Sequence, residues 1–258
     1  MIGSTLKSMH PYYAAQRRRD SPALRLFCFP YAGGNSYCFN KWRSALPAGI
    51  EVYPVEIPGR GIRSKEPLRT NLEELVDSVC QEVVCRTDVP FGFFGHSMGA
   101  LIGFEIARRL RCQKHHAPAC LCVSGHRAPQ TPPERWHLHE TTDELFVEEL
   151  RRLHGTPTEV LESRELMELF LPILRADFAV CETYSYVPEP PLACPIIAFV
   201  GIDDADVTLA HVEAWREQTV SDFRLYRIPG DHFFLHTAER QVLYLLSSEL
   251  QRLEYTNP

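Results

Sequence analysis

Ser97 lies in the pentapeptide Gly95-His-Ser-Met-Gly99, a G-x-S-x-G pattern that presents a nucleophilic serine at a strand-to-helix turn. The apolar run Phe91–Gly95 precedes the serine, and a helical apolar pattern begins at Met98. A sharp turn between these elements exposes the hydroxyl, and the start of the helix directs partial positive charge towards it. Glycines two residues before and two residues after the serine leave the space that such a turn requires. We therefore predict Ser97 to be a nucleophile.

A serine hydroxyl is weakly nucleophilic and needs a general base that a third group orients. His232 lies in the segment Pro229–Phe234, directly after the last apolar run that is typical of a strand, and Gly230 supplies a turn there. Because the usual chain order behind a G-x-S-x-G serine is serine, acid, histidine, His232 is the predicted base.

Three carboxylates compete for the role of the acid, because Gly201–Asp206 follows a late strand and reads Gly-Ile-Asp-Asp-Ala-Asp. The spacing G-x-x-D favours Asp204, with Asp206 second and Asp203 third. At least two of the three must be solvated or must cap the helix that Thr208 begins, where acidic groups are favourable.

An oxyanion hole is needed to stabilise the tetrahedral intermediate. The backbone N–H of Met98, directly after the serine, supplies one donor. The second is expected from the loop Phe29–Gly34, with Ala32 as donor and Tyr31 as a substrate contact. The glycines of this loop do not form a phosphate-binding motif, because neither G-x-G-x-x-G nor a Walker lysine is present.

The candidate site residues lie between short apolar runs and helical patterns that alternate along the chain. This alternation is typical of a mainly parallel sheet flanked by helices. The expected strands are Leu24–Pro30, Ile50–Ile57, Phe91–Gly95, Ala119–Ser124, Ile196–Gly201 and Phe223–Ile228. With Ser97 and His232 at the ends of strands, this alternation predicts an α/β-hydrolase fold over residues 21–258. A capping box at Thr70-x-x-Glu73 predicts the start of one helix.

A long insertion, about residues 126–192, interrupts the alternation and is predicted to be a helical lid. Its helices are expected over Asp143–Leu153, capped by Thr141-x-x-Glu144, and over about Glu159–Ala176. A structural helical appendage is the alternative. The apolar side chains expected to line an acyl pocket are Leu145, Phe146, Leu166, Met167, Phe170 and Leu171.

Composition restricts the partners and the compartment. The formal net charge is −6, which argues against nucleic acid or an anionic membrane as the main partner. The nine cysteines include no C-x-x-C pair, so free thiols in a reducing cytoplasm are expected and a zinc site is not. Residues 1–20 lack the apolar segment of a signal peptide and are expected to form a poorly ordered extension.

Five motifs together resemble those of the type II thioesterases, the separate partners of polyketide synthases and nonribosomal peptide synthetases. They are Phe29-Pro-Tyr-Ala-Gly-Gly34, Pro58-Gly-Arg-Gly61 with Arg63, Gly95-His-Ser-Met-Gly99, Leu174-Arg-Ala-Asp-Phe178 and Gly230-Asp-His-Phe-Phe-Leu235. The family often has Gly-Gly-His where this chain has Gly-Asp-His, which leaves the histidine intact.

The resemblance implies hydrolysis of acyl groups from the phosphopantetheine arm of acyl or peptidyl carrier proteins by a cytoplasmic monomer without metal or cofactor. It suggests that Arg60 and Arg63 meet the acidic carrier or its phosphate, with ordinary surface charge as the alternative. Two other functions remain open from the sequence: an esterase or acyltransferase on small esters, and a non-catalytic binding protein of hydrolase fold.

Overall fold

A single parallel sheet forms the centre of the computed structural model, which describes residues 22–132 and 137–256. The predicted N-terminal extension, residues 1–20, lies outside the described residues. The strand order is β2-β1-β3-β4-β5-β6, and every neighbouring pair is parallel. The strands are β1 Leu24–Phe29, β2 Ile50–Pro54, β3 Phe91–His96, β4 Leu121–Ser124, β5 Ile196–Gly201 and β6 Phe223–Ile228.

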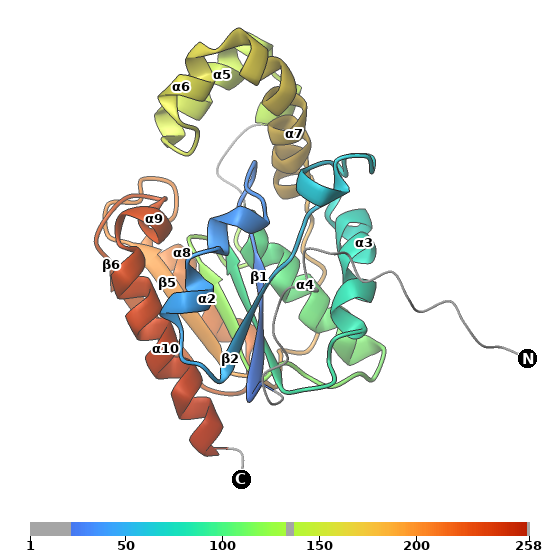
Figure 1. Cartoon of the computed structure of the whole chain (residues 1–258), viewed down its shortest axis with the longest axis vertical. Helices are drawn as coiled ribbons and strands as arrows, with labels where there is room; N and C mark the ends of the chain where they lie inside the picture. The colour runs from blue at the N-terminus through green and yellow to red at the C-terminus, as the bar shows by residue number, and fades with distance from the viewer. Residues whose placement is uncertain (1–21, 133–136, 257–258) are drawn as a thin grey trace, which may run out of the picture.

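Helices cover both faces of the sheet (Figure 1). The helices α3 (Leu72–Val84), α4 (Met98–Cys112) and α8 (Leu209–Glu213) pack on one face, together with the 3₁₀ turn Ala214–Gln218. On the other face lie α2 (Trp42–Ala45), α9 (Phe234–Thr237) and α10 (Glu239–Thr256). All strands except the edge strand β6 are almost completely buried, as expected for sequences that are nearly continuous apolar runs.

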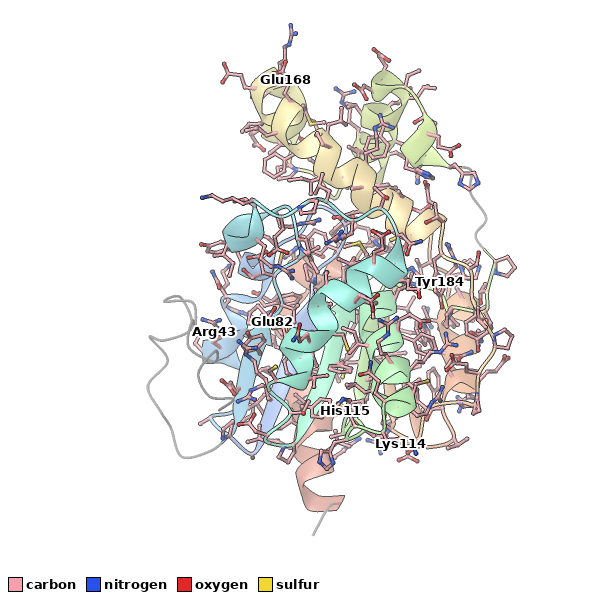
Figure 2. All side chains as sticks on the ribbon, turned by 90° about the vertical axis from the view of Figure 1, so that its right-hand side faces the viewer. Arg43, Glu82, Lys114, His115, Glu168 and Tyr184 are labelled. Carbon is pink, nitrogen blue, oxygen red and sulfur yellow. The ribbon has the colours of Figure 1, made fainter. Side chains whose placement is uncertain are left out.

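The lid is formed by the 3₁₀ turn η3 (Leu138–Glu140) and the helices α5 (Asp143–Leu153), α6 (Thr158–Glu162) and α7 (Arg164–Glu182). It stands above one end of the sheet in Figure 1. In Figure 2, Glu168 marks its far end and Lys114 and His115 lie at the opposite end of the molecule. Its own apolar cluster consists of Phe146, Leu150, Leu161, Met167 and Leu174.

The predicted caps of two helices and the continuity of a third helix were wrong, and some strands end earlier or begin later than expected, such as β2 at Pro54 and β4 at Leu121. Asn71, not Thr70, caps α3 by accepting the N–H groups of Glu73 and Glu74, and Thr142, not Thr141, caps α5. The helix expected from about Glu159 is two helices, because Ser163 ends α6 and caps α7.

No helix within residues 22–132 and 137–256 is both long and apolar enough to cross a membrane.

Aromatic packing stabilises the centre of the sheet. The Phe93 side chain is fully buried, and its ring meets those of Phe27 and Phe29 edge to face at centroid distances of 5.9 and 5.6 Å. Such pairs contribute beyond the burial of their area.

Phe93→Ala is predicted to lower the free energy of unfolding by about 3–5 kcal/mol, because a large cavity is left in a packed core. Urea denaturation measures this loss. Tyr244→Ala is the control, since Tyr244 on α10 is 72% exposed and its loss is expected to change stability by less than about 0.5 kcal/mol.

Candidate active site

Ser97 connects β3 to α4 with φ 52° and ψ −120°, a backbone conformation that is unfavourable for a residue with a side chain. The N–H of Ser97 donates to the carbonyl of Ser124 at the end of β4, at 2.7 Å. A Cβ at Gly95 would lie 2.1 Å from the Gly99 carbonyl oxygen, and a Cβ at Gly99 would lie 2.1 Å from that of Phe29. Backbone atoms cannot yield at such distances, so only glycine fits at these two positions.

His232 lies between Ser97 and Asp204. Its Nε2 is 3.1 Å from Ser97 Oγ, and its Nδ1 is 2.8 Å from Asp204 Oδ2. The three residues follow three different strands, β3, β5 and β6, whose carboxyl ends meet at one edge of the sheet. The arrangement is that of a nucleophile, its base and an orienting acid.

Among the three competing carboxylates, the structure places Asp204 against the histidine. The other Asp204 oxygen, Oδ1, accepts the backbone N–H groups of Asp206 and Val207 at 3.0 and 2.9 Å. The Asp206 carboxylate instead meets Arg152 of α5 at 3.2 Å, and Asp203 is exposed.

Burial alone would raise the pKa of Asp204, but the hydrogen bond and charge of His232 and the two backbone N–H groups outweigh it, so the pKa is lowered from its usual value. Asp204 is therefore ionised at neutral pH and can stabilise a positive charge on His232.

His96 packs beside the site rather than taking part in the hydrogen-bonded series. Its Nδ1 lies 2.9 Å from Ser124 Oγ, and its ring centroid lies 5.4 Å from that of His232. Burial first, and the neighbouring histidines second, hold the pKa of His96 well below its usual value. His96 is consequently neutral and adds no charge that would oppose protonation of His232.

Two backbone N–H groups near Ser97 are candidates to donate to an oxyanion. Met98 is the first residue of α4, so its N–H has no acceptor within the helix. The loop after β1 turns tightly, with Gly34 N–H donating to the Tyr31 carbonyl at 2.9 Å, and Ala32 lines the same cavity as Ser97. The Gly33 N–H is already used, since it donates to Asp177 at 2.7 Å. Ala32 and Met98 are thus the candidate oxyanion donors.

A cavity of about 230 Å³ lies between the lid and the carboxyl ends of the strands and reaches Ser97, His232 and Tyr31. Most of the large apolar side chains in its wall come from the lid, and one aromatic side chain comes from the segment after β6. These are Leu138, Leu150, Leu153, Leu174, Phe178 and Phe233.

The sequence predicted the wrong lid residues for this wall. Phe146 and Met167 are buried in the lid's own cluster, where Phe146 packs edge to face on Phe178 at 5.2 Å. Phe170 is 36% exposed, and like Phe146 and Met167 it is not part of the cavity lining. An amphipathic helical pattern shows that a side chain packs inwards but not against which neighbour.

The predicted contact of Arg60 with a carrier is also wrong. Arg60 is buried and forms a two-pronged ion pair with Asp177, with both N–O distances 2.6 Å. Arg63 is held by the Glu66 carboxylate and by the carbonyls of Glu56 and Ser78. Both guanidinium groups are therefore occupied by partners within the chain.

His126 and Asp177 are site residues that the sequence analysis did not assign. His126 lines the cavity, and its Nδ1 is 2.7 Å from the Arg127 carbonyl. Burial, followed by the charge of Arg127, lowers the pKa of His126 to about 3, so it is a neutral polar group in the cavity wall. The motif Leu174–Phe178 pointed to Asp177 as a residue of interest. The sequence could not show its partners, because Gly33 and Arg60 lie far from it in the chain.

One group of side chains among the described residues has the composition of a metal site: His137, His139 and Glu182. The Glu182 oxygens accept the backbone N–H groups of Leu138 and His139, both at 3.0 Å. This capping of the 3₁₀ turn explains the position of Glu182 without a metal.

A second, larger cleft of about 750 Å³ opens at the amino ends of the strands, beside Phe91 and Ile196. Ser97 and His232 lie at the opposite edge of the sheet, so this cleft takes no part in their chemistry.

Comparison with known proteins identifies relatives of the whole chain. A model of the thioesterase domain family matches residues 24–249. The gramicidin S biosynthesis protein GrsT of Aneurinibacillus migulanus is 42% identical over 246 residues, which cover 95% of this chain and 96% of that protein.

Two solved structures are similar over nearly their whole length. ClbQ from the colibactin NRPS/PKS pathway has a TM-score of 0.87 and 33% identity, covering 91% of this chain and 99% of that chain. YbtT, a type II thioesterase from the yersiniabactin NRPS/PKS biosynthetic pathway, has a TM-score of 0.81 and 32% identity, covering 91% and 96%. This likeness confirms the predicted fold class.

Asp204→Asn is predicted to lower kcat by about 10⁴-fold, because the amide can neither hold the histidine tautomer nor stabilise the imidazolium. Asp206→Asn, the matched control on the same loop, removes the charge of a partly exposed carboxylate that pairs with Arg152 and is expected to lower kcat by less than about threefold. Steady-state hydrolysis rates decide between the two. A larger loss for Asp206→Asn would reverse the assignment.

Proposed function

Because the chain belongs to the thioesterase family, we propose that it hydrolyses acyl groups from the phosphopantetheine arm of carrier proteins in nonribosomal peptide or polyketide biosynthesis. It would thereby clear aberrant chains or release the product. The observation that carries the proposal is the position of His232, within hydrogen-bond distance of both Ser97 and Asp204 at the floor of a lid-covered cavity.

In the acylation step, Ser97 Oγ attacks the thioester carbonyl carbon while His232 Nε2 takes the serine proton. The carbonyl oxygen becomes an oxyanion, which the N–H groups of Ala32 and Met98 stabilise. The intermediate then collapses, the carbon–sulfur bond breaks, and the pantetheine sulfur leaves with the proton from His232. Little acid assistance is needed, because a thiolate leaves more readily than an alkoxide.

In the deacylation step, water attacks the acyl-serine and His232 again accepts the proton. The second tetrahedral intermediate expels Ser97 Oγ, which takes the proton back, and the free carboxylic acid departs. Asp204 keeps the His232 Nδ1 proton directed towards itself throughout and stabilises the imidazolium in both steps.

The cavity under the lid is the proposed acyl site. Its apolar wall suits a hydrocarbon chain, and its end at Ser97 leads to the oxyanion donors. Polar groups in the cavity wall that could orient a substrate include neutral His126 and the Tyr31 hydroxyl, which lies 2.8 Å from His236 Nε2.

The site requires no further component in this account. Ser97, Asp204, His232 and the donors come from one chain, and each step uses only these groups and water, so the proposed mechanism needs neither a second subunit nor a cofactor. All nine cysteines are free, as expected in a reducing compartment, which supports action in the cytoplasm.

The test compares one acyl group on four leaving groups: a phosphopantetheinylated carrier protein, coenzyme A, N-acetylcysteamine and p-nitrophenol. We predict the highest kcat/KM for the carrier thioester, because only this substrate adds contacts with a partner protein. We also predict that Ser97→Ala abolishes turnover of all four substrates. A marked preference for the p-nitrophenyl ester would contradict the proposal and favour an esterase.

A further inference from the structure

A buried ion pair joins the lid to the loop that carries the proposed oxyanion donor. Asp177, on the lid helix α7, accepts both terminal nitrogens of Arg60 at 2.6 Å and also the backbone N–H of Gly33 at 2.7 Å. Arg60 in turn donates to the Gly34 carbonyl at 3.1 Å. Asp177 is 1% exposed and Arg60 is 6% exposed, so water does not compete for these bonds.

These contacts fix the peptide groups on both sides of Ala32. The Tyr31 carbonyl and the Ala32 N–H belong to one planar trans peptide and point in opposite directions. Gly34 N–H holds that carbonyl inside the turn, which directs the Ala32 N–H outwards. The next peptide carries the Gly33 N–H, and Asp177 holds it from the other side.

The same helix also packs directly on this turn. Gly33 has φ 79°, and a Cβ there would lie 2.5 Å from a methyl carbon of Leu174, one turn before Asp177 on α7. The turn is therefore held between a leucine and a carboxylate of one lid helix. A shift of α7 would be transmitted to the Ala32 N–H.

We propose that Asp177 is a positioning residue for the oxyanion hole: through the Gly33 N–H, it sets the direction of the Ala32 N–H and couples the lid to the reaction centre. This inference rests on the proposed function, because it takes Ala32 as an oxyanion donor. Asp177 does not touch the substrate.

The proposal is tested by two double variants that both remove the buried charges. Arg60→Met/Asp177→Asn retains an acceptor for the Gly33 N–H, whereas Arg60→Met/Asp177→Leu, of nearly the same shape, does not. Removing both charges avoids leaving one of them buried and unpaired. Asp143→Asn is the matched control, because it breaks the Arg175–Asp143 ion pair between α7 and α5 without reaching the loop.

The decisive readout is the affinity for an alkyl trifluoromethyl ketone whose chain matches the best acyl substrate. Ser97 Oγ adds to the ketone carbon, its proton passes to His232, and the ketone oxygen becomes an oxyanion in the hole. Ground-state binding is measured separately as the dissociation constant of the acyl-carrier thioester in a Ser97→Ala background.

We expect Arg60→Met/Asp177→Leu to lose about 10- to 100-fold in kcat and in ketone affinity relative to Arg60→Met/Asp177→Asn, with thioester binding changed by less than about threefold. Asp143→Asn should match the unmodified chain. Equal ketone affinity in the two double variants would overturn the proposal, even if kcat differed.

Melting curves establish which variants fold. If the leucine variant does not fold, the variant Arg60→Met/Asp177→Asn still tests the proposal. Because it retains an acceptor for the Gly33 N–H, its ketone affinity should lie within about threefold of that of the unmodified chain. A loss of more than about tenfold would contradict the positioning role. Failure of the proposed function has a different signature, since the unmodified chain would then fail to hydrolyse the carrier thioester, whatever the ketone affinities of the variants.

Discussion

The close backbone approach around Ser97 is the constraint on which the rest of the site depends. Gly99 packs so tightly on the end of β1 that a Cβ would lie 2.1 Å from the Phe29 carbonyl oxygen. The same contact places the loop after β1 beside the first turn of α4, so the packing that strains the serine also brings together the proposed oxyanion donors at Ala32 and Met98. The position of Ser97 and that of the proposed oxyanion donors are thus two results of one contact.

A second feature, the buried charges, connects this centre to the lid. Burying an ion pair stabilises a fold little, because desolvation offsets the attraction between the charges. The Arg60–Asp177 pair instead fixes how three segments lie relative to one another. It joins the loops after β1 and β2 to α7 through hydrogen bonds that apolar side chains could not replace. In the proposed mechanism, a lid attached in this way belongs to the active site as well as covering it.

The sequence was sufficient for the sheet, and its chain order indicated the residues that the structure brings together. Ser97, Asp204 and His232 each follow a strand, and parallel strands bring their carboxyl ends to one edge whatever their exact lengths. The capping residues were missed by one position, because Thr70 and Asn71 are both capping types and only the backbone decides between them. The partner of Arg60 could not be predicted, since Asp177 is distant in sequence and a charged residue is usually exposed.

The lid was the least predictable part. Its helices bury apolar side chains both in their own cluster and in the cavity wall, and one apolar stripe does not distinguish these two environments. Leu150 and Leu174 belong to both, whereas Phe146 and Met167 belong only to the cluster.

The central claim is that Ser97 carries the acyl group between carrier and water. Rapid-quench mass spectrometry with an acyl-carrier thioester tests it most directly. In the first turnover, the peptide that contains Ser97 should gain the mass of the acyl group and lose it again as free acid appears. The variant His232→Ala should greatly slow the appearance of the acylated peptide. Free acid formed at the same rate with no acylated Ser97 at any quench time, or acylation of another residue, would contradict the account.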